Sequence, residues 1–156
     1  MNKRIVSRNV ATNMKVVFFI VFIAYVQATS EPFDPKKVFD QNVHHCVEEH
    51  GLNKDYVVKI LNQNTYPEDD KDFSIFYDCV ADRLSMYEPN GDINFKHPYL
   101  EPFIRERLKL DDTVDVKTLI EKAVEHCAKS PKVEPRVVNA IRRRNCGAEH
   151  IAKHIH

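Results

Sequence analysis

Four cysteines constrain the fold of this 156-residue chain more than any other feature. Cys46, Cys79, Cys127 and Cys146 are separated by 32, 47 and 18 residues, so no two of them form the closely spaced pair of a zinc ribbon or a thioredoxin-type redox site. An even number of cysteines in a short exported chain is typical of disulfides. Four cysteines can pair in three ways, and we expect two bridges that staple a small domain.

The first 28 residues have the pattern of a signal peptide. Four basic residues lie among the first 15, an unbroken apolar run follows at 16–26, and Ala28 supplies a small residue for cleavage. An apolar helix of this length rises only about 16 Å, whereas the hydrocarbon core of a bilayer is about 30 Å thick, so we expect no stable membrane insertion. Cleavage after Ala28 would release residues 29–156 as one secreted, extracellular domain.

The charge of the expected domain argues against nucleic-acid binding. All 23 acidic residues but only 19 of the 23 basic residues follow residue 28, which gives a net charge of about −4. The one basic run, Arg142–Arg144, is expected on the solvated face of a late helix. The chain has no nucleophile elbow, phosphate loop or dinucleotide fingerprint, so we expect neither an enzyme nor a bound cofactor or metal.

Apolar residues recur at intervals of three and four along most of the domain, which predicts helices. Asp34-Pro35 and Asn53 are expected at the starts of the first two. The expected helices cover residues 34–50, a short segment after Asn53, and about 70–86, 98–110, 113–129 and 134–145. The segment after Cys146 is expected either to extend the last helix or to cross the body. The predicted fold class is all-α, a compact bundle of about six helices around an internal hydrophobic cavity.

This arrangement resembles the insect odorant-binding proteins over essentially the whole chain. That family usually has six cysteines, with three residues between the second and third and eight between the fifth and sixth. Cys79 and Cys146 fit the third and sixth, whereas Ile75 and Val137 stand where the second and fifth would be. The two missing cysteines are bridged to each other in the family. The chain therefore resembles its four-cysteine "minus-C" branch, with an apolar Ile75/Val137 pair in place of the central bridge.

The resemblance implies the disulfides Cys46–Cys79 and Cys127–Cys146. It also implies a secreted carrier of small hydrophobic ligands such as odorants, pheromones or other semiochemicals or lipids, present as a monomer or weak homodimer. Delivery of the ligand to a membrane receptor is part of the same expectation.

Candidate ligand-binding residues come from the strongest apolar helix faces, although apolar faces usually form plain core. Tyr77 could also offer a hydroxyl to a ligand oxygen. The candidates are Phe73, Phe76, Tyr77, Val80, Leu84, Phe103, Leu108, Leu119, Val124, Val138 and Ile141.

Two further hypotheses concern the histidines near the C-terminus and an alternative function. His150 and His154 would share one helical face at a spacing that can bind zinc, although we expect surface histidines. With His156 they also suggest a tail that docks and undocks with pH. The alternative function is a secreted helical interaction protein of venom, saliva, haemolymph or reproductive fluid, with Arg142–Arg144 as a working surface.

Overall fold

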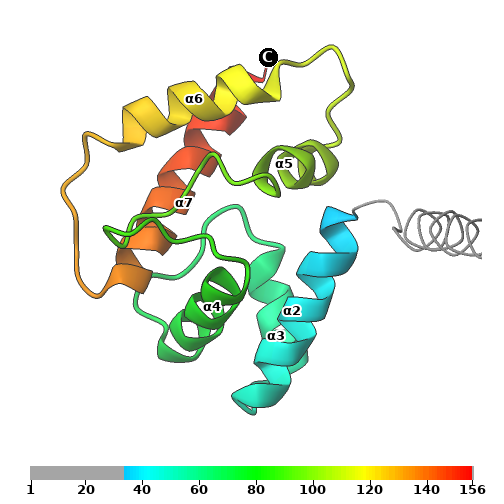
Figure 1. The fold of residues 1–156 in the computed structure, drawn as a ribbon, viewed down its shortest axis with the longest axis vertical. Helices are drawn as coiled ribbons and strands as arrows, with labels where there is room; N and C mark the ends of the chain where they lie inside the picture. Colours follow the sequence, from blue (N-terminus) through cyan, green and yellow to red (C-terminus); the bar gives the residue numbers. More distant parts are fainter. Residues whose placement is uncertain (1–33, 156) are drawn as a thin grey trace, which may run out of the picture. The chain divides into compact units, whose positions relative to one another are not determined.

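The structure, a computed structural model, describes residues 34–155, and the predicted signal peptide lies outside them. These residues form six helices and contain no strand beyond one isolated bridge, which confirms the predicted all-α class. None of these helices is long and apolar enough to span a membrane. The helices are α2 (Pro35–Glu49), α3 (Lys54–Leu61), α4 (Lys71–Arg83), α5 (Leu100–Leu108), α6 (Val116–Cys127) and α7 (Arg136–His154) (Figure 1).

Side-chain caps set the starts of three helices. Each cap residue is an Asn or Asp whose side-chain oxygen accepts a hydrogen bond from a backbone N–H of the first turn, a group that otherwise has no partner. Asn53 caps α3 at 3.0 Å, Asp70 caps α4 at 2.9 Å and Asp115 caps α6 at 3.0 Å. The cap predicted at Asn53 is therefore confirmed, and local sequence decides where these helices begin.

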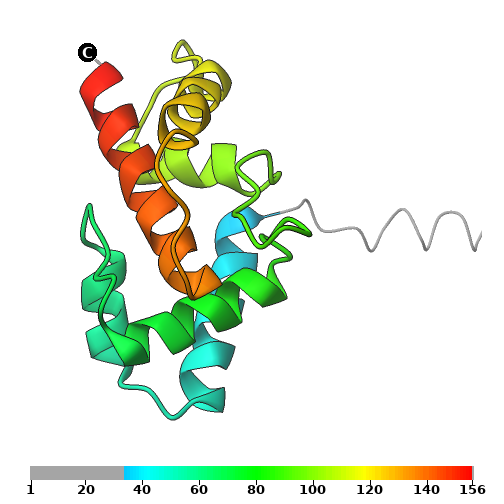
Figure 2. The ribbon, with the colours of Figure 1, turned by 90° about the vertical axis from the view of Figure 1, so that its left-hand side faces the viewer.

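Helix α7 links the two main hydrophobic clusters of the domain. Val137 and Ile141 in its first half join a cluster built from α2, α3 and α4, whereas Ile151 near its end joins a cluster built around α6. Figure 2 shows α7 passing α4 with its first turns and lying beside α6 with its later turns. The last helix therefore runs on well past the range predicted for it, because the tail buries Ile151 rather than leaving the domain.

The turn before α5 is tight and well ordered by its own hydrogen bonds. The Glu88 N–H donates to the Asp92 carbonyl at 2.7 Å, and the Gly91 N–H donates to the Glu88 carbonyl at 2.9 Å. Gly91 has a φ of +80°, a backbone conformation that residues with a side chain rarely adopt. Ile93 is buried directly after the turn, so the turn fixes the path of the chain into α5.

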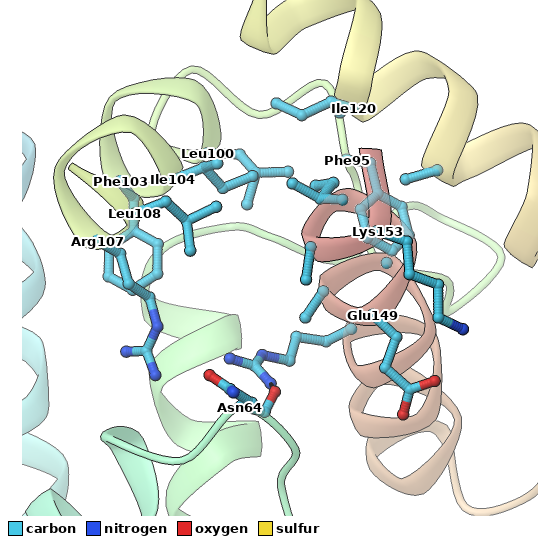
Figure 3. Close-up of a pocket in the computed structure, with 16 residues that line it drawn as sticks. Asn64, Phe95, Leu100, Phe103, Ile104, Arg107, Leu108, Ile120, Glu149 and Lys153 are labelled. Carbon is cyan, nitrogen blue, oxygen red and sulfur yellow. Dashed lines mark hydrogen bonds between the residues drawn. The ribbon is translucent and has the colours of Figure 1, made fainter. Parts of the chain in front are cut away.

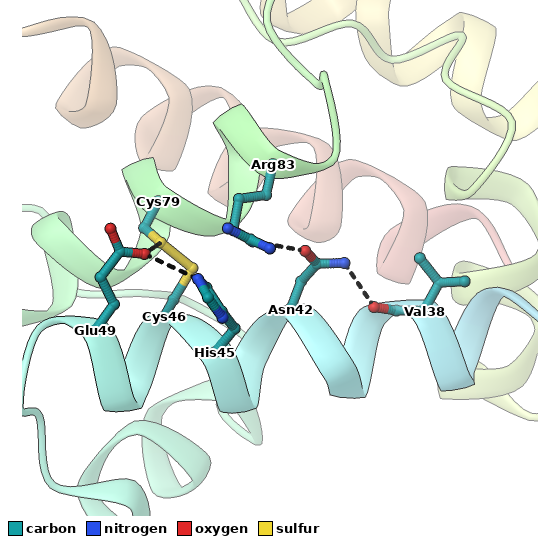
Figure 4. Close-up of a disulfide and its surroundings, with 7 residues drawn as sticks. All are labelled: Val38, Asn42, His45, Cys46, Glu49, Cys79 and Arg83. Carbon is teal, nitrogen blue, oxygen red and sulfur yellow. Dashed lines mark hydrogen bonds and ion pairs between the residues drawn. A yellow bond between two sulfur atoms is a disulfide. The ribbon is translucent and has the colours of Figure 1, made fainter.

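Both disulfides implied by the resemblance are present. Cys46–Cys79 joins α2 to α4, and Cys127–Cys146 joins α6 to α7. A polar link lies beside the first bridge: Arg83 Nε donates to Asn42 Oδ1 at 3.0 Å across the same two helices (Figure 4). Each end of the domain is thus stapled separately, with α7 connecting the two ends.

The expected Ile75/Val137 pair does not form as a buried contact. Ile75 is 46% exposed, whereas Val137 is only 9% exposed and lies in the core. The α4 members of that core cluster include Phe73 and Phe76, which flank Ile75 in sequence. Because successive helical residues point about 100° apart, the α4 face that meets the core turns Ile75 toward solvent.

Candidate ligand-binding pocket

A pocket of about 360 Å³ lies between α5, α6 and the second half of α7. Its volume is near the lower end of the range for small-molecule sites, about 300–1,000 Å³. Figure 3 shows side chains from these helices converging on it. The apolar lining consists of Phe95, Leu100, Phe103, Ile104, Leu108, Ile120, Ala123, Gly147, Ala148, Ile151 and Ala152.

The sequences of α5 and α7 explain why space remains here. Helix α5 has apolar residues at spacings of three and four, yet none of its residues is buried, and Leu108 is 39% exposed. Its apolar face borders the pocket instead of closing onto α7. On the facing side α7 presents Gly147 and Ala148, which have little or no side chain to fill the volume.

A second pocket of about 100 Å³ adjoins the first. It is lined mainly by residues of α2, α4 and the loop after α4, including Phe39 and Met86. Leu100, Phe103 and Arg144 line both pockets, so these three side chains form the partition between them.

The structure separates the predicted wall residues into four groups. Phe103 lines both pockets, Leu108 lines the larger one, and four residues of α4 and its C-terminal end line the smaller one: Phe76, Tyr77, Val80 and Leu84. The others line neither pocket and pack in the hydrophobic clusters: Phe73, Leu119, Val124, Val138 and Ile141. Contact between any of these residues and a ligand stays a prediction.

Tyr77 is the polar residue that the sequence singled out among the wall candidates. It lines the smaller pocket, and its ring lies 6.1 Å from that of Phe73. Burial raises the pKa of the Tyr77 hydroxyl well above its usual value. The hydroxyl therefore stays protonated at physiological pH and can donate a hydrogen bond.

Residues of the last helix are the main part of the lining that the sequence did not identify. Gly147, Ala148 and Ile151 lie beyond the range predicted for that helix, so no buried face could be assigned to them. Ile104 could have been found, because it shares the apolar face of α5 with Leu108. Arg144 was missed because an apolar-face argument leaves out cationic residues.

The expectation that Arg142–Arg144 forms one solvated surface is wrong. Arg142 is partly exposed and pairs with Glu68 at 2.7 Å. Arg143 is only 8% exposed and donates to the Ser130 carbonyl at 2.9 Å. The Arg144 guanidinium carbon lies 3.6 Å from the centre of a tyrosine ring. Three consecutive residues of a helix point in three directions, and α7 is covered on several sides, so they cannot share one face.

Two histidines of α2, His44 and His45, are exposed. His44 and His45 lie 3.2 Å from Glu48 and Glu49, one turn further along α2. Within residues 34–155, one group brings metal-ligand atoms close together: Glu49, His50 and Cys79. The Cys79 sulfur is bonded to Cys46, so it offers no thiolate to a metal.

The two histidines at the end of α7 do share a face, as predicted. The His150 ring stacks on that of His154 with 4.2 Å between centres, and the centre of the His126 ring of α6 lies 4.7 Å from that of His150. Burial lowers the pKa of His150, and the neighbouring His154, His126 and lysine charges act in the same direction. His156 lies outside the described residues, and the pH-dependent tail stays a prediction.

Comparisons with known proteins agree with this fold. Residues 32–100, which contain α2, α3, α4 and the first disulfide, match the model of the PBP/GOBP family. The fold is similar to that of the odorant-binding protein dmelOBP28a from Drosophila melanogaster, with a TM-score of 0.57 and 15% sequence identity. The alignment covers 78% of this chain and 98% of that chain. Over residues 32–100 the chain is therefore similar to the PBP/GOBP family. No curated protein sequence gave a significant match.

The cysteine pattern agrees with the branch that the sequence resembles. Residues 34–155 contain four cysteines in two disulfides and no free cysteine, which fits the minus-C pattern. The match to dmelOBP28a establishes the helical fold alone. At 15% sequence identity, the ligand of one protein does not predict the ligand of the other.

Proposed function

We propose that the protein is a carrier that binds small hydrophobic ligands in the pocket between α5, α6 and α7. The observation that supports this most is the pocket itself, about 360 Å³ and lined mainly by apolar side chains. Transfer of a ligand's apolar surface from water into such a site is favourable by about 25 cal/mol per Å². A few polar groups at the pocket would set the orientation of the ligand.

Transport in an extracellular fluid is the second part of the proposal. The signal-peptide pattern of residues 1–28 supports export, and two disulfides suit an oxidising compartment. We propose a monomer or weak homodimer that gives up its ligand to a membrane receptor. Expression of the full chain in insect cells, with N-terminal sequencing of protein from the medium, tests export and cleavage after Ala28.

The binding test is displacement of a hydrophobic fluorescent probe from the protein recovered from that medium. A panel of alcohols, esters and carboxylic acids of increasing chain length serves as competitors. Saturable binding with selective displacement supports a carrier. Ala148→Phe should weaken binding of the displacing ligands at least tenfold, because the new ring enters the pocket that Ala148 lines.

The matched control is Ala128→Phe, which adds the same ring at an exposed position outside both pockets. It should bind as the unmodified protein does. Absence of binding by a helical protein with both disulfides closed would refute the carrier function and favour a secreted interaction protein. Equal binding by both variants would mean that the ligand binds at another part of the domain.

A further inference from the structure

One side of the larger pocket is polar, in contrast to the rest of its wall. Its polar lining residues are Asn64, Arg107, Arg144, Glu149 and Lys153. In Figure 3 the polar ends of Arg107, Asn64 and Glu149 lie along the lower part of the view, while Leu100 and Ile120 lie along the upper part. Three of the five residues are cationic and one is anionic. The pocket thus has an apolar end and a cationic edge.

Neither arginine at this edge is paired with a carboxylate within residues 34–155. Arg107 Nη2 donates to the Gln63 carbonyl at 3.0 Å. Arg144 Nη1 donates to the Asn64 carbonyl and, at 3.3 Å, to Asn145 Oδ1. By contrast, Arg105, Arg136 and Arg142 each form an ion pair with a carboxylate. A guanidinium has five N–H donors, and the bonds made by Arg107 and Arg144 leave donors over for a ligand.

The surroundings of Arg144 are costly for a cation without an anionic partner. Burial lowers the pKa of its guanidinium, and the nearby charge of Arg107 acts in the same direction. The ring of Tyr66 below the guanidinium offsets part of this cost through a cation–π contact. A carboxylate between the two arginines would neutralise both charges and form charge-assisted hydrogen bonds.

We propose that the pocket selects an amphiphilic anion, a medium-chain carboxylic acid whose chain fills the apolar end and whose carboxylate binds Arg107 and Arg144. This inference rests on the proposed carrier function and narrows the class of its ligand. Glu149 and Lys153, a turn apart on α7, flank the same edge with opposite charges. The charges of Glu149 and Lys153 balance each other. The net positive charge of this edge therefore comes from Arg107 and Arg144.

The test compares three ligands with the same chain: dodecanoic acid, methyl dodecanoate and dodecanol. Their affinities are measured at pH 7 by probe displacement on the full-chain product secreted from insect cells. The unmodified protein should bind the acid at least tenfold more tightly than the ester or the alcohol. Arg107→Gln should remove roughly tenfold of that preference and leave ester binding unchanged, because only the carboxylate uses the charge.

Controls separate this site from a purely structural role of the arginines. Arg83→Gln, which removes the same charge from the end of α4 outside both pockets, should keep the preference for the acid. Circular dichroism and melting temperature show whether Arg107→Gln keeps its fold, and Arg107→Glu should disfavour the acid further. Tight ester binding without any preference for the acid would overturn this proposal and leave the carrier function standing. Failure of all three ligands to bind would instead count against the carrier function.

Discussion

Asn145 should be among the most costly residues to remove from this domain, because one side chain satisfies two buried backbone groups. Its Oδ1 accepts from the Tyr66 N–H at 2.7 Å, and its Nδ2 donates to the Tyr66 carbonyl at 2.8 Å. Tyr66 is only 6% exposed, so water cannot readily replace these bonds. The pair fixes the loop between α3 and α4 against α7, and that loop supplies Asn64 to the larger pocket.

The magnitude follows from the two backbone groups that Asn145→Ala leaves unpaired. Each unpaired buried group costs about 1–3 kcal/mol. Alanine returns about 0.5 kcal/mol through its better helix propensity. We therefore expect the free energy of unfolding to fall by about 1.5–5.5 kcal/mol. With a urea m-value of about 2 kcal/mol/M, the midpoint of unfolding should drop by roughly 1–3 M.

Urea unfolding followed by far-UV circular dichroism measures this change. Asn42→Ala is the matched control, since Asn42 also lies on a helix and makes two hydrogen bonds, but at a partly exposed site. It should cost less than about 1 kcal/mol. Asn145→Asp keeps the acceptor for the Tyr66 N–H and loses the donor, so it should fall between the two. A midpoint for Asn145→Ala within about 0.3 M of the unmodified protein would refute the reasoning.

Three further predictions concern stability. Replacing Cys127 and Cys146 by serine opens a loop of 19-residue separation and should lower the free energy of unfolding by about 3 kcal/mol in urea titrations. Because the pKa of His150 is lowered in the fold, the unfolded chain binds more protons below about pH 6.5, and stability should fall as the pH drops through that range. His150→Gln should flatten this slope in melting temperatures between pH 5 and 7.5, and an unchanged slope contradicts it. Gly147→Ala should raise stability by about 1 kcal/mol, since its new Cβ would meet Phe95 at an ordinary 3.7 Å; a lower melting temperature would show hidden crowding.

The local sequence determined where most of the helices lie. Asn53 stands where a cap is needed, Pro35 begins α2, and apolar spacing outlines the buried faces of α4 and α6. These features act over one or two turns, so they are readable without the rest of the chain. The family's cysteine spacing supplied the disulfide pairing, which spacing by itself left open among three alternatives.

Only the tertiary structure decided which apolar residues border empty space and which fill the core. Phe73 and Ile141 have the same apolar character as Phe103, yet the first two are fully buried and the third lines both pockets. The difference depends on where α5 packs against α2 and α6, an arrangement that tertiary contacts set. The extension of α7 past Cys146 likewise placed Gly147 at the pocket. Periodicity reports that a face is apolar, but the side chains opposite that face decide whether it meets protein or a ligand.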